Sequence, residues 1–471
     1  MLNISILYGL AGIAAQLLQF FTLPIYARNL TQAEFGIVAI LESLLYLCTV
    51  LLTFSIERAA QRFYFDKSLT PKRVFSSALI WLVASGVVWF GLAAIVEATG
   101  LLSFYSFPGG GALLIVLGAW ASGVCGLAIV YFQVTERPIF FNFLNLIRGI
   151  SILGLAYFLI EVQKKGVEGY LWSITAANFL AATFSLLLLR KNWQFRFNPP
   201  LLREMLKFSS PFVPTMLGAW LLTMGGRFFL STYSTLEEVA LYTFLSKVSL
   251  AYFMCATAIN TALSPVLYRI LAENPNAKEV SLDILRPVVR IYGLGALAFI
   301  VIAGDLGELM GGGVYELPPI LLSLIIVGHF CSSVMGGSSD VLLSYFKKTK
   351  LQMYAFLAGA SLCILLNLVL APTLGVAGIL LATTSSLVFI IGCHWVLISR
   401  MSLPSVPVRD VLGWMLTILL LGLIIAHFKI EFLGVGIGIR VLISSLLLAF
   451  ALLTLSGMKT PRTHLDRTSA S

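Results

Sequence analysis

Residues 112–134 read ALLIVLGAWASGVCGLAIVYFQV and contain no charged side chain. A helix needs roughly 20 consecutive apolar residues to cross the hydrocarbon core of a bilayer, and this stretch is long enough. A short polar gap with Glu136 and Arg137 follows, and then a second apolar stretch at residues 139–160. This alternation of apolar stretches and short gaps is typical of a chain that crosses a membrane several times.

The same pattern continues along the whole 471-residue chain. Hydrophobic residues make up 59% of the chain and charged residues 11%, whereas an ordinary soluble domain carries about 25% charged residues. We therefore predict an all-α polytopic membrane protein with about fourteen spanning helices and no soluble domain. The predicted helices cover residues 4–26, 36–56, 75–97, 112–134, 139–160, 170–189, 210–230, 239–262, 289–304, 319–343, 351–371, 376–398, 411–427 and 441–457.

The basic residues predict the orientation, because lysine and arginine in short loops favour the cytoplasmic side. If the N-terminus is inside, the outer gaps hold few basic residues, namely Arg28, Lys164, Lys165, Lys429 and Arg440. Most of the 31 lysines and arginines then lie in cytoplasmic gaps or in the C-terminal tail. We therefore predict that both termini are cytoplasmic. The net charge of +10 is spread over separate loops, so it indicates topology and does not indicate nucleic-acid binding.

Two short motifs are repeated in the chain. The sequence LTQAEFG at residues 30–36 has a counterpart in STLEEVA at residues 234–240, and a glycine triplet occurs at both 109–111 and 311–313. The repeat predicts two six-helix bundles, an N-terminal one at residues 1–190 and a C-terminal one at residues 210–400, joined by a cytoplasmic linker at residues 191–209. An extra helix pair at residues 401–457 and a cytoplasmic tail at residues 458–471 follow. Parallel halves of this kind place a substrate path between them in transporters.

Away from the two terminal residues at each end, the predicted helices contain five charged residues: Arg148, Arg227 and Lys247 are basic, and Glu42 and Asp340 are acidic. A cation at the bilayer centre costs about 2.5–3.5 kcal/mol, so such side chains usually face a bundle interior or a wet cavity. We treat the three cations as candidate substrate-binding residues and the two acids as candidate ion-coupling residues. Their balance favours an anionic ligand. The alternative is that Arg148 and Lys247 pair with carboxylates or carbonyls and only hold helices together.

Arg58 and Arg62 follow the second predicted helix at its inner end. They are further candidates for substrate binding, because guanidinium groups bind phosphate oxygens bidentately. The alternative is that they anchor the helix at the lipid headgroups. His329 and His394 are candidates for carrying protons, since histidine titrates near neutral pH, with helix packing as the alternative.

Catalytic, cofactor and metal sites are not predicted. The six cysteines lie in apolar segments and form no Cys-x-x-Cys pair, so neither a disulfide nor a metal site is indicated. The glycine triplets lack the Gly-Lys-Ser/Thr ending of a phosphate-binding loop, so no ATP site is indicated either. The start of the chain lacks the basic segment of a secretory signal, and the first helix is expected to be retained.

Two regions resemble a known family. The string PIYARNL at residues 24–30, continuing to Gly36, resembles the opening of bacterial polysaccharide biosynthesis proteins, the Wzx-type oligosaccharide flippases. The string LREMLKFSSPFVP at residues 202–214, together with the segment from Arg227 to Lys247, is similar to that family's seventh and eighth helices. The family commonly has an acidic residue just before the arginine, where this chain has Gly226, so the resemblance does not imply a local ion pair.

The resemblance implies a transporter and not an enzyme, with two helical bundles and alternating access. The family belongs to the superfamily of multidrug, oligosaccharidyl-lipid and polysaccharide exporters. The implied substrate is a lipid-linked oligosaccharide on undecaprenyl diphosphate, moved across the bacterial cytoplasmic membrane for surface polysaccharide such as the O-antigen of lipopolysaccharide. The implied partners are this substrate, the lipid bilayer and components of a polysaccharide polymerase.

Two alternatives stay open at this stage. One is a cation-coupled multidrug exporter of the same superfamily, which usually needs carboxylates to bind a cationic drug. The other is a membrane-embedded glycosyltransferase or polymerase. The longest outer gaps, near 98–111 and 305–318, hold only Asp305, Glu308 and Glu316 as acidic residues, which counts against the second alternative.

Overall fold

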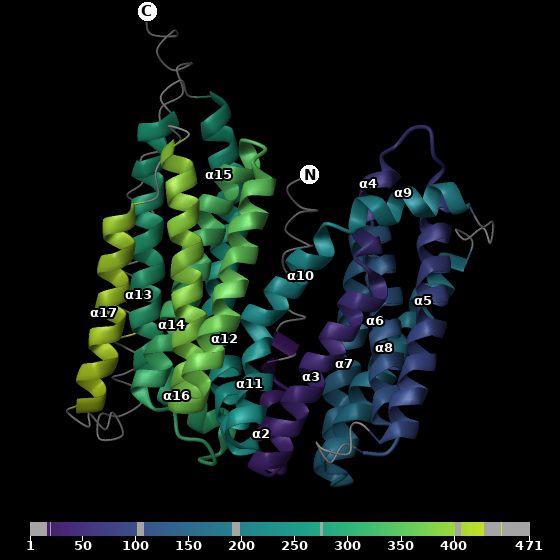
Figure 1. Cartoon of the computed structure of the whole chain (residues 1–471), viewed down its shortest axis with the longest axis horizontal. Coiled ribbons are helices and arrows are strands. Elements are labelled where there is room, and N and C mark those ends of the chain that lie inside the picture. The colour runs from purple at the N-terminus through teal and green to yellow at the C-terminus, as the bar shows by residue number, and fades with distance from the viewer. Residues whose placement is uncertain are drawn as a thin grey trace, which may run out of the picture. The chain divides into compact units, whose positions relative to one another are not determined.

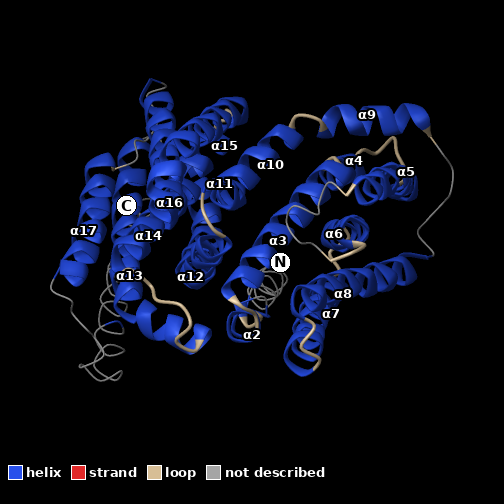
Figure 2. Ribbon diagram, turned by 60° about the horizontal axis from the view of Figure 1, so that its bottom comes forward, coloured by secondary structure: helices blue, strands red, loops and turns tan. Residues whose placement is uncertain are grey.

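The computed structural model describes residues 17–18, 20–100, 108–190, 198–273, 277–400, 407–427 and 444. All regular structure in these residues is helical, as Figure 2 shows, and the predicted all-α class is confirmed. The chain forms two compact units, Met1–Phe244 and Leu245–Ser471, which we describe separately.

Ten helices in the described part are long and apolar enough to span a membrane. They coincide with the predicted helices 2 to 6 and 8 to 13; residues 112–134, for example, correspond to Gly111–Val134. The seventh predicted helix, 210–230, is present as three consecutive segments, α10 (Phe212–Trp220), η4 (Leu221–Gly225) and α11 (Gly226–Tyr233). Of the first predicted helix only the last part is described, with α2 (Leu23–Asn29) at its end. The fourteenth, 441–457, lies outside the described residues apart from Ser444.

The longest helical segment, α16 (Thr349–Arg400), contains two spans and not one. A straight helix of 52 residues would be about 78 Å long, more than twice the thickness of the hydrocarbon core. Gly375 has φ 52° and ψ −128°, a conformation that is open mainly to glycine, and it interrupts the helix. The two predicted spans 351–371 and 376–398 are the two arms on either side of it.

Within the described residues of the first unit, α6 (Gly111–Val134) packs against five helices: α3 (Gln32–Thr53), α4 (Ile56–Tyr64), α5 (Pro71–Thr99), α7 (Pro138–Ala156) and α8 (Gly166–Leu189). Its buried face is rich in small residues, including Ala119, Ala121, Gly123 and Ala128. Small side chains let helix backbones approach closely, which is how helices associate in a membrane. In the second unit, α14 (Pro319–Val334) packs against α13 (Ala277–Gly311), α16 and α17 (Val408–His427).

Two short amphipathic helices lie outside the spans among the described residues of the first unit. The helix α3 ends where Phe54 and Ser55 both adopt left-handed backbone angles with φ 53°, and α4 (Ile56–Tyr64) then continues in another direction. It packs against α9 (Pro199–Ser209), which lies within the predicted linker, and Figure 1 shows the two side by side. Hydropathy did not predict either helix, because both are short and carry charged faces.

In the described part of the chain, three π-helical turns interrupt predicted spans: η2 (Tyr157–Val162), η4 and η5 (Met335–Ser339). A π-turn widens the helix by one residue and is often found at functional sites. Two of the three immediately precede charged residues inside the spans. The turn η4 is followed by Gly226 and Arg227, and η5 is followed by Asp340, the first residue of α15 (Asp340–Tyr345).

The orientation of the spans is open to a direct test with reporter fusions. We expect a reporter that is active only outside the cytoplasm to be active after Gly100 or Gly313 and inactive after Lys67 or Lys348. The reason is the accumulation of basic residues in alternate gaps. A reporter that is active only in the cytoplasm serves as the control and should give the reverse pattern. External activity after Lys67 would contradict the predicted topology.

Candidate functional site

An ion pair between a buried arginine and a partly exposed glutamate joins α11 to α3 within the first unit. Arg227 is only 4% exposed, and its Nη1 donates hydrogen bonds to the carboxylate of Glu42 at 3.1 Å, to the Ala39 carbonyl oxygen at 3.0 Å and to Ser43 Oγ at 3.1 Å. All three acceptors lie on adjacent turns of α3. A guanidinium group with a carboxylate partner and two further acceptors is stable inside a membrane, because its charge and its donors are compensated.

A glycine permits this close approach of the helices. A Cβ atom on Gly36 of α3 would overlap the backbone carbonyl of Leu236, the first residue of α12 (Leu236–Glu273). Gly36 belongs to the first copy of the repeated motif and Leu236 to the second copy. The two copies therefore contact each other, and α11, which ends directly before the second copy, comes to lie against α3.

The ion pair brings together Glu42, a candidate for ion coupling, and Arg227, a candidate for substrate binding. Their opposite charges compensate each other, so this part of the unit offers little net charge to a ligand. Sequence reasoning did not pair them, because they are 185 residues apart and the position before Arg227 is glycine. Their functional roles stay predictions.

Arg148 has a different environment. It lies half-buried on α7, and its charge acts on the Cys125 thiol of α6. Its buried Nε has no hydrogen-bond partner among the described residues. On the neighbouring helix α8, Asn178 is fully buried, and its side-chain oxygen and nitrogen likewise lack partners in the described part of the chain. A buried donor without an acceptor is unfavourable, so Arg148 is suited to binding an anion.

Arg58 and Arg62 are exposed on α4. The guanidinium carbon of Arg58 lies 5.3 Å from the centre of the Phe212 ring, a cation–π contact, and its Nη2 lies 3.8 Å from the sulfur of Met216. These contacts tie α4 to α10 and still leave guanidinium donors accessible. Burial raises the pKa of the adjacent Glu57 carboxyl, against the opposing effects of a backbone hydrogen bond and of Arg58.

The remaining candidates lie in the second unit. Lys247 is half-buried on α12, and two residues further along, Ser249 Oγ is 3.0 Å from Nε2 of His329. Asp340 Oδ1 lies 3.7 Å from Nδ1 of His394 on the second arm of α16. Among the described residues, no cluster of three or more histidine, cysteine, aspartate or glutamate side chains could hold a metal ion.

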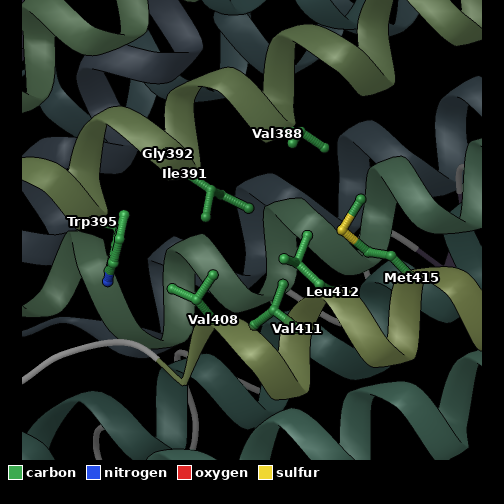
Figure 3. A pocket seen from close by; sticks show the side chains of 8 residues that line it. All are labelled: Val388, Ile391, Gly392, Trp395, Val408, Val411, Leu412 and Met415. Carbon is green, nitrogen blue, oxygen red and sulfur yellow. The ribbon is translucent and has the colours of Figure 1, made fainter.

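An apolar cavity of about 100 Å³ lies between α16 and α17 in the second unit. Figure 3 shows that it is lined from both helices without any charged side chain; the lining residues are Val388, Ile391, Gly392, Trp395, Val408, Val411, Leu412 and Met415. Such a lining suits hydrocarbon and cannot compensate a phosphate charge.

Comparison with known proteins supports this description. The sequence model of a family described as polysaccharide biosynthesis protein matches residues 2–271, more than half of the chain. No curated protein sequence gives a significant match.

Several solved structures share the fold. One is the lipid II flippase MurJ in an inward closed conformation, with a TM-score of 0.70, 16% identity, and coverage of 96% of this chain and 98% of that chain. The inward-facing conformation of a multidrug resistance MATE family transporter of the MOP superfamily has a TM-score of 0.55 and 15% identity, and covers 82% of this chain and 94% of that chain. The outward-facing conformation of a multidrug resistance MATE family transporter of the MOP superfamily has a TM-score of 0.52 and 14% identity, and covers 85% of this chain and 94% of that chain. The chain therefore shares its fold with these solved transporter structures.

Proposed function

Because the chain belongs to the polysaccharide biosynthesis protein family, we propose that it is a flippase that moves a lipid-linked oligosaccharide across the bacterial cytoplasmic membrane. The carrier lipid is undecaprenyl diphosphate, and the product is a surface polysaccharide such as the O-antigen of lipopolysaccharide. Transport proceeds by alternating access, and components of the polysaccharide polymerase receive the substrate afterwards. The observation that carries the proposal is the family match over residues 2–271, supported by a fold shared with a lipid flippase over most of the chain.

The charges of the first unit support an anionic substrate. Arg227 is neutralised by Glu42, whereas the Nε of Arg148 has no acceptor among the described residues. A diphosphate offers several oxygen acceptors, and a guanidinium group can bind two of them at once. We therefore assign binding of the diphosphate inside the membrane to Arg148 and a mainly structural role to Arg227.

Arg58 and Arg62 suit the first contact with the headgroup. They are exposed on α4, directly after a span, at the end that we predict to be cytoplasmic. Arg58 is held in position by Phe212 and Met216 and keeps donors free for a phosphate. The lipid-linked oligosaccharide is made on that side of the membrane in this proposal, so its diphosphate would meet α4 before it enters the bundle.

The multidrug exporter is the second candidate, favoured by the fold shared with a MATE family transporter. Deleting the gene in its host separates the two functions. A flippase predicts loss of surface polysaccharide and accumulation of lipid-linked units on the inner leaflet, with unchanged resistance to cationic drugs. Normal polysaccharide together with hypersensitivity to cationic drugs would support the exporter and reject the flippase.

Arg148→Ala is expected to lower polysaccharide export by about tenfold or more while leaving the amount of protein in the membrane unchanged. The reason is that a hydrogen bond to a charged group contributes about 1.5–3 kcal/mol, which is ten- to a hundredfold in binding. Export is measured as surface polysaccharide, and protein level by immunoblotting of membranes.

Two further variants complete the Arg148 test. Arg148→Lys keeps the charge and loses the planar fork, so partial export indicates electrostatic attraction and no export indicates bidentate contact. Arg203→Ala, an exposed arginine on α9, is the control and should export normally. Wild-type export by Arg148→Ala would remove Arg148 from the mechanism, and a lower protein level would indicate that it holds helices together.

A further inference from the structure

A carboxyl group and an imidazole lie together inside the spans of the second unit. Asp340 begins α15 directly after the π-turn η5, and His394 comes from the second arm of α16. We propose that Asp340 and His394 form a proton-binding site that holds one proton and couples its release to the conformational change of the transporter. The coupling role rests on the transport function proposed above, whereas the proton-binding site itself does not.

The geometry of the pair is not that of a permanent ion pair. Asp340 Oδ1 and His394 Nδ1 are 3.7 Å apart, whereas a hydrogen bond between charged groups would bring them to about 2.7–2.9 Å. Nδ1 is instead 3.1 Å from the hydroxyl oxygen of Ser339. Asp340 Oδ1 and His394 Nε2 have no hydrogen-bond partner within the described part of the chain. Each group therefore keeps an atom that can accept a proton.

Charge balance favours one proton on the pair. With one proton, a neutral carboxylic acid faces a neutral imidazole, and the pair carries no net charge. Loss of that proton leaves a carboxylate and gain of a second one leaves an imidazolium, and a single charge is costly in a membrane interior. The side chain of Asp340 is 29% exposed and that of His394 is 0% exposed, so Asp340 is the member of the pair through which the proton enters and leaves.

The other titratable groups on the neighbouring helices have contacts of their own or are exposed. Tyr292 of α13 donates a hydrogen bond to Asn260, and His329 of α14 contacts Ser249. Tyr345 of α15 packs against the ring of Tyr268. The remaining ones on α14, α15, α16 and the loop before α16 are the thiols of Cys331, Cys363 and Cys393 and the exposed side chains of Lys347, Lys348, Lys350, Tyr354 and Arg400. Gln352, which is uncharged, hydrogen-bonds the Asp340 carboxyl.

The same surroundings favour a proton over a metal cation. A hard metal cation takes several oxygen ligands, whereas a proton needs only one acceptor atom. The partner of Asp340 here is a nitrogen, and no third acidic, histidine or cysteine ligand completes a metal site among the described residues. Histidine is also the side chain that changes charge near neutral pH.

The protonation state of the pair determines which conformation of the transporter is favoured. The one-proton pair can stay buried, whereas the unprotonated carboxylate is stable only when water reaches it. Proton release therefore favours a state in which Asp340 is more accessible, and proton binding favours a state in which it is closed off. Two states with different proton affinity are what coupling to a proton gradient requires.

The test uses the purified full-length protein in lipid nanodiscs, without substrate, and records infrared difference spectra over a pH series. Protonation of a carboxylate produces a carboxylic acid carbonyl band, and isotope-labelled aspartate shifts the band if an aspartate produces it. The chain has five other aspartates, so we expect the wild-type band to contain a component, with its own midpoint, that Asp340→Asn lacks. In His394→Gln we expect its midpoint to move by about one pH unit or more, because a neighbouring titratable group alters the titration of an aspartate by about that much.

Glu308→Gln, which removes an exposed carboxyl from α13, is the control and should leave the aspartate band unchanged. If Asp340→Asn does not accumulate, Asp340→Glu answers the same question, because the carboxyl then no longer carries the aspartate label. A labelled band that is the same in the wild-type chain and in these variants, or a midpoint that His394→Gln leaves in place, would overturn the proposal. Loss of the band on adding sodium ions at constant pH would overturn it in favour of a sodium site. A chain that titrates as expected and yet does not move lipid-linked oligosaccharide would instead reject the flippase function alone.

Discussion

Glu42→Gln is expected to remove most of the protein from the membrane. The change leaves Arg227 buried with no counter-charge, and breaking a buried pair from one side costs about 3–5 kcal/mol. Native proteins are stable by only about 5–15 kcal/mol, so this cost is a large fraction of the total. The measurements are the amount of protein in isolated membranes and the thermal unfolding of the purified remainder.

The double variant Glu42→Gln with Arg227→Met is the decisive control. Removing both charges leaves no unpaired ion, so the amount of protein should return to near the wild-type level. Glu308→Gln, at an exposed position, should have no effect. The structural role would be contradicted if Glu42→Gln accumulated normally. If the double variant accumulates normally but does not export, the pair also takes part in transport.

Gly36→Ala should have the second large effect. Its Cβ would overlap the Leu236 carbonyl, which is backbone and cannot rotate away as a flexible side chain could. The crossing of α3 with the start of α12 must then open, and overpacking of this kind costs about 1–3 kcal/mol. We expect a lower melting temperature and reduced export, and a larger loss with Gly36→Val. The change also moves α11 away from α3, so it weakens the contact between Arg227 and Glu42.

The matched control is Gly91→Ala in α5. Nothing lies within 4 Å of the position that its Cβ would take, and the residue is in the interior of a helix. Alanine is a better helix former than glycine by about 1 kcal/mol, so this variant should be as stable as the wild type or slightly more stable. Equal losses from both glycine substitutions would show that close packing at Gly36 is not the cause.

Hydropathy predicted the spans well, because a spanning helix needs an apolar stretch of bilayer length and such stretches can be recognised directly in the sequence. Residues 139–160 were predicted where Pro138–Val162 is found, and the two arms of Thr349–Arg400 were predicted as the separate spans 351–371 and 376–398. The helix α4 was missed, because a short helix with a charged face has no apolar stretch. The π-turns were missed, because hydropathy does not report which carbonyl an amide bonds to.

The partners of the charged residues could not be predicted in the same way. The sequence indicated that Arg227 and Asp340 needed compensation inside the membrane. It did not indicate that Glu42 lies beside Arg227 or that His394 lies beside Asp340, because these contacts join segments far apart in the chain. A repeated motif placed Gly36 and Leu236 at equivalent positions, but equivalence in a repeat does not by itself predict contact.

The joint between α3 and α4 has an energetic consequence. Phe54 and Ser55 are consecutive non-glycine residues in the left-handed conformation, which costs about 1–2 kcal/mol for each residue. The burial of Ile56, Ala59 and Ala60 of α4 must offset this cost to keep the joint bent. Moving one elementary charge through 100 mV releases about 2.3 kcal/mol, which is of the same size. The bent joint thus stores backbone strain. If α4 left its packing site, the backbone would relax toward a straight helix, and the free energy released would match what the membrane potential delivers per charge.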